Sequence, residues 1–172
     1  MNDQVKQNWY VVKTNPRAEK KVYDRIISLG IDAYLPLVST IRQWSDRKKK
    51  VDLPLISSTL FINCSEKDFA KIFNVPGFHS FLYYLRKPAI VRDYEINNLR
   101  ILLQENVEFE SIETEKLLKG DRVEVIRGPF QGLIATSVEI DRSHKLIVEI
   151  EGMDQKFIVH VPRTYVRKIR SN

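Results

Sequence analysis

The side chains that most often perform catalysis or bind metals are few and scattered in this sequence. Three histidines and one cysteine stand apart from one another along the chain, at His79, His144, His160 and Cys64. No pair of them has the spacing of a metal site. Neither a phosphate-binding glycine loop nor a nucleophile elbow occurs. We therefore expect no catalytic residue, no metal and no cofactor, and predict that the protein is not an enzyme.

The strongest chemical signal is a basic stretch, residues 42–50, between two apolar-rich segments. Ser45-Asp46 favours a turn, so two strands are predicted to flank a basic tip. Cations at such a tip neutralise phosphates in a salt-dependent and largely sequence-blind way. A short charged run is more commonly just a solvated tip, and this alternative stays open. The candidate nucleic-acid contacts here are Arg42, Arg47, Lys48, Lys49 and Lys50.

Composition places the chain among globular proteins with a core of their own. Its 172 residues are 43% hydrophobic and 29% charged, with a net charge of +6. These values suit one ordinary domain or two small ones. No apolar run approaches the roughly 20 residues of a membrane helix, and the N-terminus lacks the apolar centre of a signal peptide. We expect a cytoplasmic monomer with no membrane partner, in which Cys64 packs as a small hydrophobe.

Charge also divides the chain along its length. Residues 105–116 carry five glutamates and one lysine, whereas the segments on both sides are net basic. Without Gly or Pro, this segment could extend the preceding helix, but its weak apolar periodicity favours an acidic linker. We therefore predict two domains, at residues 1–104 and 117–172, joined by the linker 105–116.

The first domain is predicted to be an α+β layer, with helices flanking a central antiparallel sheet. Asn15-Pro16 is expected to start a helix, and Gly30 to end it in the left-handed conformation. Pro36 predicts a bend or an edge in the next strand. Thr59–Cys64 is expected to be a central strand because its side chains are mostly apolar.

From residue 117 onward the pattern is typical of strands. Alternating and β-rich segments are separated by turns near residues 128–132, 141–144 and 152–154. About five short strands in about fifty residues predict a small β-barrel. Gly128 and Gly132 are expected to be turn glycines with positive φ.

Seven segments, in order and spacing, resemble the NusG family of transcription elongation factors, in which an N-terminal NusG domain (NGN) precedes a C-terminal KOW domain. These segments are Trp9–Val12, Gly30, Tyr34–Pro36, Pro54–Ile62, Val75–Gly77, Pro88–Val91 and the KOW-like Lys119–Gly132. The stretch Gln43–Lys49 further resembles the UpxY-type specialised paralogues, which are antiterminators of polysaccharide operons. The resemblance covers nearly the whole chain.

The resemblance implies that the first domain binds RNA polymerase through a hydrophobic concavity that receives the tip of the clamp coiled coil. An apolar face suits this role, because a helix tip docks by burying area and aromatic side chains anchor it. Equally, the same side chains would fill the core under the helices, and both interpretations stay open. The candidate polymerase contacts are Ile56, Thr59, Phe61, Phe81, Tyr84 and Ile90.

Nucleic acid and a further protein partner are also implied by the resemblance. Non-template or upstream DNA, or an acidic polymerase surface, would meet the basic tip. Lys13, Asn15 and Arg17 would read exposed DNA bases, as in specialised paralogues. The KOW domain would contact a ribosomal protein or a termination factor through Phe130 and Ile134. A small barrel buries little, so Phe130 is expected to be exposed.

The sequence departs from the family pattern at two places. The family's Pro-Gly-Tyr stands here as Ser57-Ser58-Thr59, so an aromatic polymerase-facing side chain is missing. A late KOW glycine is replaced by Ala135, which makes a left-handed backbone there less favourable.

These features are consistent with two functions. The first is a transcription antitermination or elongation factor that spans the polymerase cleft, keeps the clamp closed and suppresses pausing and termination, at particular polysaccharide operons. The alternative is a KOW-type RNA-binding or ribosome-associated protein. Its motivation is the barrel with a basic C-terminus, which contains Arg163, Arg167, Lys168 and Arg170.

Overall fold

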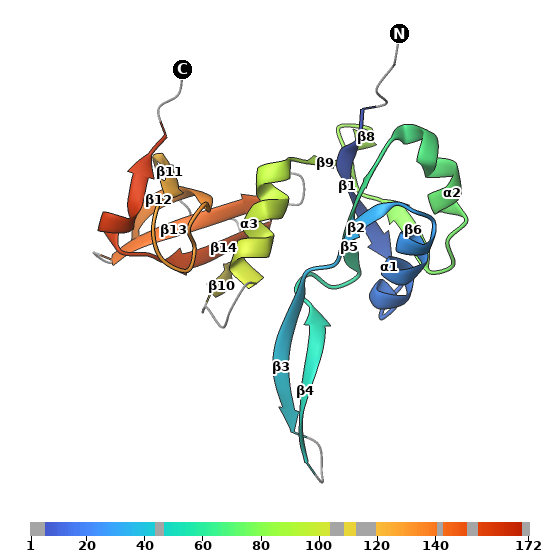
Figure 1. Ribbon diagram of the computed structural model, residues 1–172, viewed down its shortest axis with the longest axis horizontal. Coiled ribbons are helices and arrows are strands. Elements are labelled where there is room, and N and C mark those ends of the chain that lie inside the picture. The colour runs from blue at the N-terminus through green and yellow to red at the C-terminus, as the bar shows by residue number, and fades with distance from the viewer. Residues whose placement is uncertain are drawn as a thin grey trace. The chain divides into compact units, whose positions relative to one another are not determined.

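The computed structural model (Figure 1) describes residues 6–43, 47–103, 109–112, 120–140, 143–150 and 155–169. The chain forms two compact units, Met1–Val91 and Arg92–Asn172, and each is described by itself. Antiparallel sheets with few helices make this an α+β fold, as predicted. Among the described residues, no helix is both long and apolar enough to cross a membrane.

The first unit is built on an antiparallel sheet with the strand order β2-β5-β1-β6, and β9 also pairs with β1. Strand β5 lies between β2 and β1, which confirms the prediction of a central strand there. The strands are β1 (Asn8–Thr14), β2 (Asp32–Tyr34), β5 (Thr59–Cys64), β6 (Phe78–Phe81) and β9 (Ile90–Val91).

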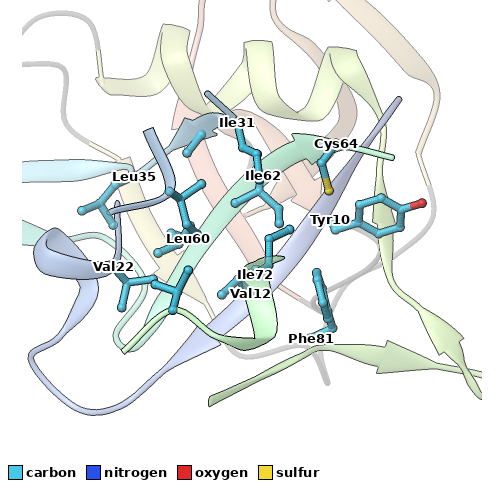
Figure 2. Close-up of a cluster of buried hydrophobic side chains, with 13 residues drawn as sticks. Tyr10, Val12, Val22, Ile31, Leu35, Leu60, Ile62, Cys64, Ile72 and Phe81 are labelled. Atoms are coloured by element: carbon cyan, nitrogen blue, oxygen red, sulfur yellow. The ribbon is translucent and has the colours of Figure 1, made fainter. Parts of the chain in front are cut away.

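One face of this sheet packs against two helices, α1 (Glu19–Ser28) and α2 (Phe69–Phe73), the latter preceded by the 3-10 turn η1 (Glu66–Asp68). Figure 2 shows side chains from the strands and both helices meeting in this core. Removing such side chains from water is the main source of stability for so small a unit. Members of the cluster include Tyr10, Val12, Val22, Leu60, Ile62, Cys64, Ile72 and Phe81.

The start of α1 differs from the prediction, whereas its end agrees. The helix begins at Glu19 with Ala18 as N-cap, so Asn15 does not cap it. Arg17 has φ 62°, a left-handed conformation that breaks the run of helical residues after Pro16. Gly30 has φ +75°, as expected for the glycine that follows a helix end.

Pro36 marks the point where the chain leaves the sheet, which confirms the predicted bend. Its carbonyl accepts a hydrogen bond from the Leu55 N–H at 2.8 Å. Between these two residues the chain forms a separate two-stranded ribbon of β3 (Leu37–Gln43) and β4 (Lys48–Pro54). In Figure 1 the ribbon extends away from the sheet of its own unit.

A second small hairpin joins β6 to β9. It consists of β7 (Tyr83–Tyr84) and β8 (Lys87–Pro88), connected by Leu85 and Arg86. The Leu82 N–H donates to the Val11 carbonyl at 2.9 Å, and β9 pairs with Trp9 and Tyr10. Both ends of the hairpin are therefore held on β1.

The second unit contains α3 (Asp93–Leu103) and an antiparallel sheet of six strands, with the order β10-β14-β13-β12-β11-β15. Strand β10 comes from the segment predicted as a linker, and the other strands come from the predicted barrel region. Within the described residues, no pairing joins β10 to β15, so the sheet is open. The strands are β10 (Phe109–Ile112), β11 (Arg122–Val125), β12 (Ile134–Ile140), β13 (Ser143–Ile150), β14 (Gln155–His160) and β15 (Val166–Lys168).

The turn between β11 and β12 has the two predicted positive-φ glycines. Gly128 has φ +83° and Gly132 has φ +88°. A Cβ on Gly128 would lie 3.0 Å from the ring of Tyr165, so the backbone also approaches an aromatic side chain closely there. Both glycines are required by the turn itself.

Candidate functional site

The basic ribbon β3–β4 gathers five of the eight predicted nucleic-acid contacts at the end farthest from Pro36, namely Arg42, Arg47, Lys48, Lys49 and Lys50. Its register opposes Ile41 to Lys50 and Gln43 to Lys48. Opposed residues share a face and successive residues alternate, so Lys48 and Lys50 lie on one face and Lys49 on the other. All three lysines are exposed, as is Arg47. The predicted turn at Ser45-Asp46 lies outside the described residues.

Among the described residues of this ribbon, negative charge lies toward the other end. Asp52 is the one carboxylate among the described residues of β3 and β4, and it accepts a hydrogen bond from the Ser39 hydroxyl. The register places this pair close to Pro36, away from Lys48. The described residues at the free end are therefore cationic on both faces, which suits phosphate neutralisation.

Lys13 and Thr59 lie opposite each other on β1 and β5. The Lys13 ammonium donates to Thr59 Oγ1 at 2.9 Å, and the Thr59 hydroxyl donates to the Ser57 carbonyl at 3.0 Å. Burial lowers the pKa of Lys13, because a charged ammonium is less well solvated there. The structure thus brings together one predicted DNA contact and one predicted polymerase contact.

Ser58 adopts a backbone conformation that the sequence analysis did not anticipate. Its φ is 52°, in the left-handed region, at the position where the family pattern has glycine. The Ser58 N–H donates to Glu19 Oε1 at 2.8 Å, and its carbonyl accepts from the Thr14 N–H at 2.9 Å. These two bonds hold Ser58 in a left-handed conformation, which glycine adopts more readily than serine.

The remaining predicted contacts near β1, Asn15 and Arg17, are exposed residues of the loop between β1 and α1. Asn15 takes part in that loop through its main chain, accepting from the Ala18 N–H at 3.1 Å. Their role in binding DNA stays a prediction.

The six predicted polymerase contacts do not form one surface. Thr59 and Phe61 are 0% exposed and Phe81 is 2% exposed. Phe81 pairs with Val12 while Phe61 pairs with Val11, so the two phenylalanines lie on opposite faces of the sheet. Ile56 is half-buried. Tyr84, at 65% exposed, and Ile90, at 51%, are the members that a partner could reach directly.

The expectation that Phe130 is exposed is wrong. Phe130 is 3% exposed, because it packs inside the unit that contains the six-stranded sheet and α3. The β11–β12 turn that carries it folds back tightly, with the Gly132 N–H donating to the Val125 carbonyl at 2.8 Å. Ile134, the other predicted partner contact, is half-buried.

An asparagine that sequence analysis missed ties α3 to β12. Asn98 Nδ2 donates to the Ile134 carbonyl at 2.6 Å, and the Ile134 N–H donates to Asn98 Oδ1 at 3.0 Å. The side chain is 1% exposed. A polar residue in an apolar helix was the available signal, but nothing in the sequence indicated its partner.

Titratable and metal-binding side chains form no reactive cluster in the described part of the chain. No group of three or more His, Cys, Asp or Glu residues there could hold a metal ion. Burial, with a smaller contribution from the Asp68 carboxylate, raises the pKa of Cys64 to about 12, so its thiol is protonated at neutral pH.

Comparisons with known proteins show which family the chain belongs to. The family described as "Transcription termination factor nusG" matches residues 7–100, more than half of the chain. The chain therefore belongs to the NusG family of transcription termination and antitermination factors, a family named for transcription factors and not for enzymes.

Individual relatives carry the same name. Over 165 residues the chain is 30% identical to the transcription termination/antitermination protein NusG of Rickettsia felis, covering 86% of this chain and 83% of that protein. The NusG of Rickettsia bellii is 25% identical over 175 residues, covering 94% and 90%. A solved structure, "Domain interaction in Thermotoga maritima NusG", is 25% identical, covers 96% of this chain and 98% of its own, and has a TM-score of 0.48.

Proposed function

We propose that this protein binds RNA polymerase across its cleft and acts as an elongation and antitermination factor. Family membership supports a role in transcription termination or antitermination. The observation that carries the finer proposal is the ribbon β3–β4, whose free end presents exposed lysines on both faces. Such an end suits the phosphates of non-template or upstream DNA beside a bound polymerase.

The mechanism is differential binding. A factor that bridges both sides of the cleft fits only the closed clamp, so its binding shifts the population toward the closed, elongating state. Exposed Tyr84 and Ile90 offer apolar area for the protein side of the bridge. In this proposal, holding the clamp closed suppresses pausing and termination.

The ribbon is tested by replacing Lys48, Lys49 and Lys50 with glutamine. Affinity for a polymerase–DNA elongation complex should fall at low salt, because phosphate contacts are lost, and the difference should shrink as salt rises. The urea midpoint should stay unchanged, since all three side chains are exposed. A matched control, Lys20, Lys21 and Lys67 to glutamine, removes the same charge from exposed helical positions.

Transcription past a terminator in vitro tests the activity itself. In an assay with polymerase and no other added factor, the purified protein should increase the fraction of transcripts that extend past the terminator. If the ribbon variant and the control variant bound the elongation complex with equal affinity, the proposed DNA contact of the ribbon would be contradicted. Failure of the unaltered protein to bind polymerase or to change termination would remove the proposal as a whole.

A KOW barrel at residues 117–172, following a linker at 105–116, is part of the proposal. The glycine turn and the run of short antiparallel strands support it. The rival function, RNA or ribosome binding through this domain, has weaker support. Arg167 pairs with Glu124 at 2.8 Å and Lys168 with Asp121 at 2.7 Å, so two of its cations are already compensated. Tight RNA binding in a filter assay without polymerase binding would favour this rival.

We further propose a specialised role of the UpxY type at polysaccharide operons. The support is the sequence Gln43–Lys49 at the ribbon tip and the altered turn at Ser57-Ser58-Thr59. Chromatin occupancy of the tagged protein at one locus would support specialisation. Occupancy at every transcribed gene would contradict it.

A further inference from the structure

The tip of the β7–β8 hairpin has an unusual backbone. Register pairs Tyr83 with Pro88 and Tyr84 with Lys87, which leaves a two-residue turn of Leu85 and Arg86. Their φ values are 49° and 64°, both positive. Two-residue turns with positive φ at both positions strongly prefer Asn-Gly, because larger side chains are strained in this region. Here neither position is Gly, Asn or Asp.

The side chains at and beside the strained turn are exposed to solvent. Leu85 is 80% exposed and Tyr83 is 56% exposed. Arg86 and Lys87 are also exposed. Strain of this kind usually persists where the surrounding structure imposes it and where the displayed group has a role. Adjacent exposed apolar side chains on a small unit are characteristic of a protein interface.

The hairpin is also presented rigidly. On one side β6 pairs with β1 through Phe81 and Val12, and on the other side β9 pairs with β1 through Ile90 and Tyr10. The Ala89 N–H donates to the Leu82 carbonyl at 2.7 Å and closes the base. A tip fixed at both ends loses little conformational entropy when it binds.

Charge narrows the choice of partner. From Leu82 to Val91 the chain contains Arg86 and Lys87 and no carboxylate. The directly opposed pair Tyr84 and Lys87 places an aromatic ring and an ammonium on one face of the hairpin. An apolar tip bordered by cations complements an apolar pocket bordered by carboxylates.

We propose that Leu85, Arg86 and Lys87 form a second docking element for RNA polymerase, inserting Leu85 into an apolar pocket with an acidic rim. This assignment rests on the proposed function and goes beyond Tyr84 and Ile90, because it names the tip residues and the chemistry of the surface they meet. Asn-Gly at positions 85 and 86 would form the turn at least as well, but it would lack the apolar side chain that inserts into the pocket. This explains why a strained Leu-Arg turn is retained.

The turn itself supplies the decisive variant. Leu85→Asn combined with Arg86→Gly installs the preferred turn and removes both displayed side chains. Its urea midpoint should equal or exceed that of the unaltered protein, while its dissociation constant for bacterial core RNA polymerase should rise about tenfold or more. Ile27→Gln, which removes an exposed apolar side chain from α1, serves as the control with unchanged affinity.

A second pair of variants tests the acidic rim. Leu85→Asn and Leu85→Asp have similar shape and both tolerate positive φ, so they differ mainly in charge. The Asp variant should bind more weakly than the Asn variant, and high salt should reduce the difference. Equal affinities of these two variants for polymerase at low salt would contradict the proposed acidic rim of the pocket.

The outcomes separate the two proposals. If the unaltered protein does not bind polymerase, the proposed function fails. If it binds and the Asn-Gly variant binds equally well, only the hairpin assignment fails. Parallel titrations with single-stranded DNA alone test nucleic acid as the ligand of the hairpin. If the Asn-Gly variant lost affinity for DNA but not for polymerase, the proposed protein pocket would be contradicted.

Discussion

Lys13 and Thr59 are cross-strand neighbours, and the Lys13 ammonium donates a 2.9 Å hydrogen bond to the Thr59 hydroxyl. The family resemblance associates one residue with DNA and the other with polymerase, so the proposed interfaces meet at a single polar pair. Thr59 stands where the family pattern has an aromatic residue. At this position the protein therefore has an ammonium held by a hydroxyl instead of an aromatic ring.

The coupling between these residues is measurable with a double-mutant cycle of Lys13→Met and Thr59→Val. We expect an interaction free energy of about 0.5 kcal/mol, small because Lys13 retains solvent access. Urea unfolding of the four proteins gives the value. Perfect additivity would mean that the hydrogen bond contributes nothing to stability.

Lys13 also predicts a pH dependence. Its pKa in the folded protein lies below the ordinary 10.5, so the unfolded chain holds the proton more tightly. The free energy of unfolding therefore gains a favourable contribution as pH rises through the folded pKa toward the ordinary value. The contribution should be absent in Lys13→Met. Urea midpoints of the two proteins are measured at several alkaline pH values. If both midpoints changed with pH in parallel, the lowered pKa of Lys13 would be contradicted.

Cys64 should resist alkylation in the folded protein. Its side chain is 1% exposed and its pKa is raised to about 12, so both access and thiolate concentration are low at pH 8. Iodoacetamide labelling followed by mass spectrometry should be slow in buffer and fast in urea, where the pKa returns to about 8.5. Rapid labelling without denaturant would show that the core opens locally at this strand.

Two glycines with similar backbone angles should respond differently to alanine. Gly77 has φ +92°, and an added Cβ would lie 2.9 Å from Val22 Cγ2, whereas Gly30 has φ +75° and nothing within 4 Å. Gly30→Ala should cost about 1 to 2 kcal/mol for the backbone alone. Gly77→Ala should cost about 1 to 3 kcal/mol more, because it also overpacks the core beside α1. Equal losses in thermal or urea unfolding would contradict the packing argument.

Asn98 should be required for docking of α3 on β12. Asn98→Leu removes both partners of the Ile134 main chain, and each buried group left unpaired costs about 1 to 3 kcal/mol. Amide hydrogen exchange at Ile134 should accelerate accordingly. Asn97→Leu alters the exposed neighbour and should change stability by about 0.5 kcal/mol or less. Unchanged exchange in Asn98→Leu would show that other contacts suffice.

The sequence alone determined the features that depend on local chemistry. Apolar run length and β-branched content indicated the central strand at Thr59–Cys64, and Pro36 indicated the bend after β2. Gly30, Gly128 and Gly132 all have the positive φ that their positions suggested. Ordered motifs along the chain indicated the family, which the comparisons confirm. Each of the structural features is encoded within a few residues, and the family is encoded by the order of short motifs.

Only the tertiary structure decided which side chains meet and which stay exposed. Strand neighbours placed Phe61 and Phe81 on opposite faces, and the packing of the second unit buried Phe130. Asn98 found its partner 36 residues away along the chain. Register and long-range pairing depend on which strand lies beside which, and periodicity within one segment carries no information about that choice.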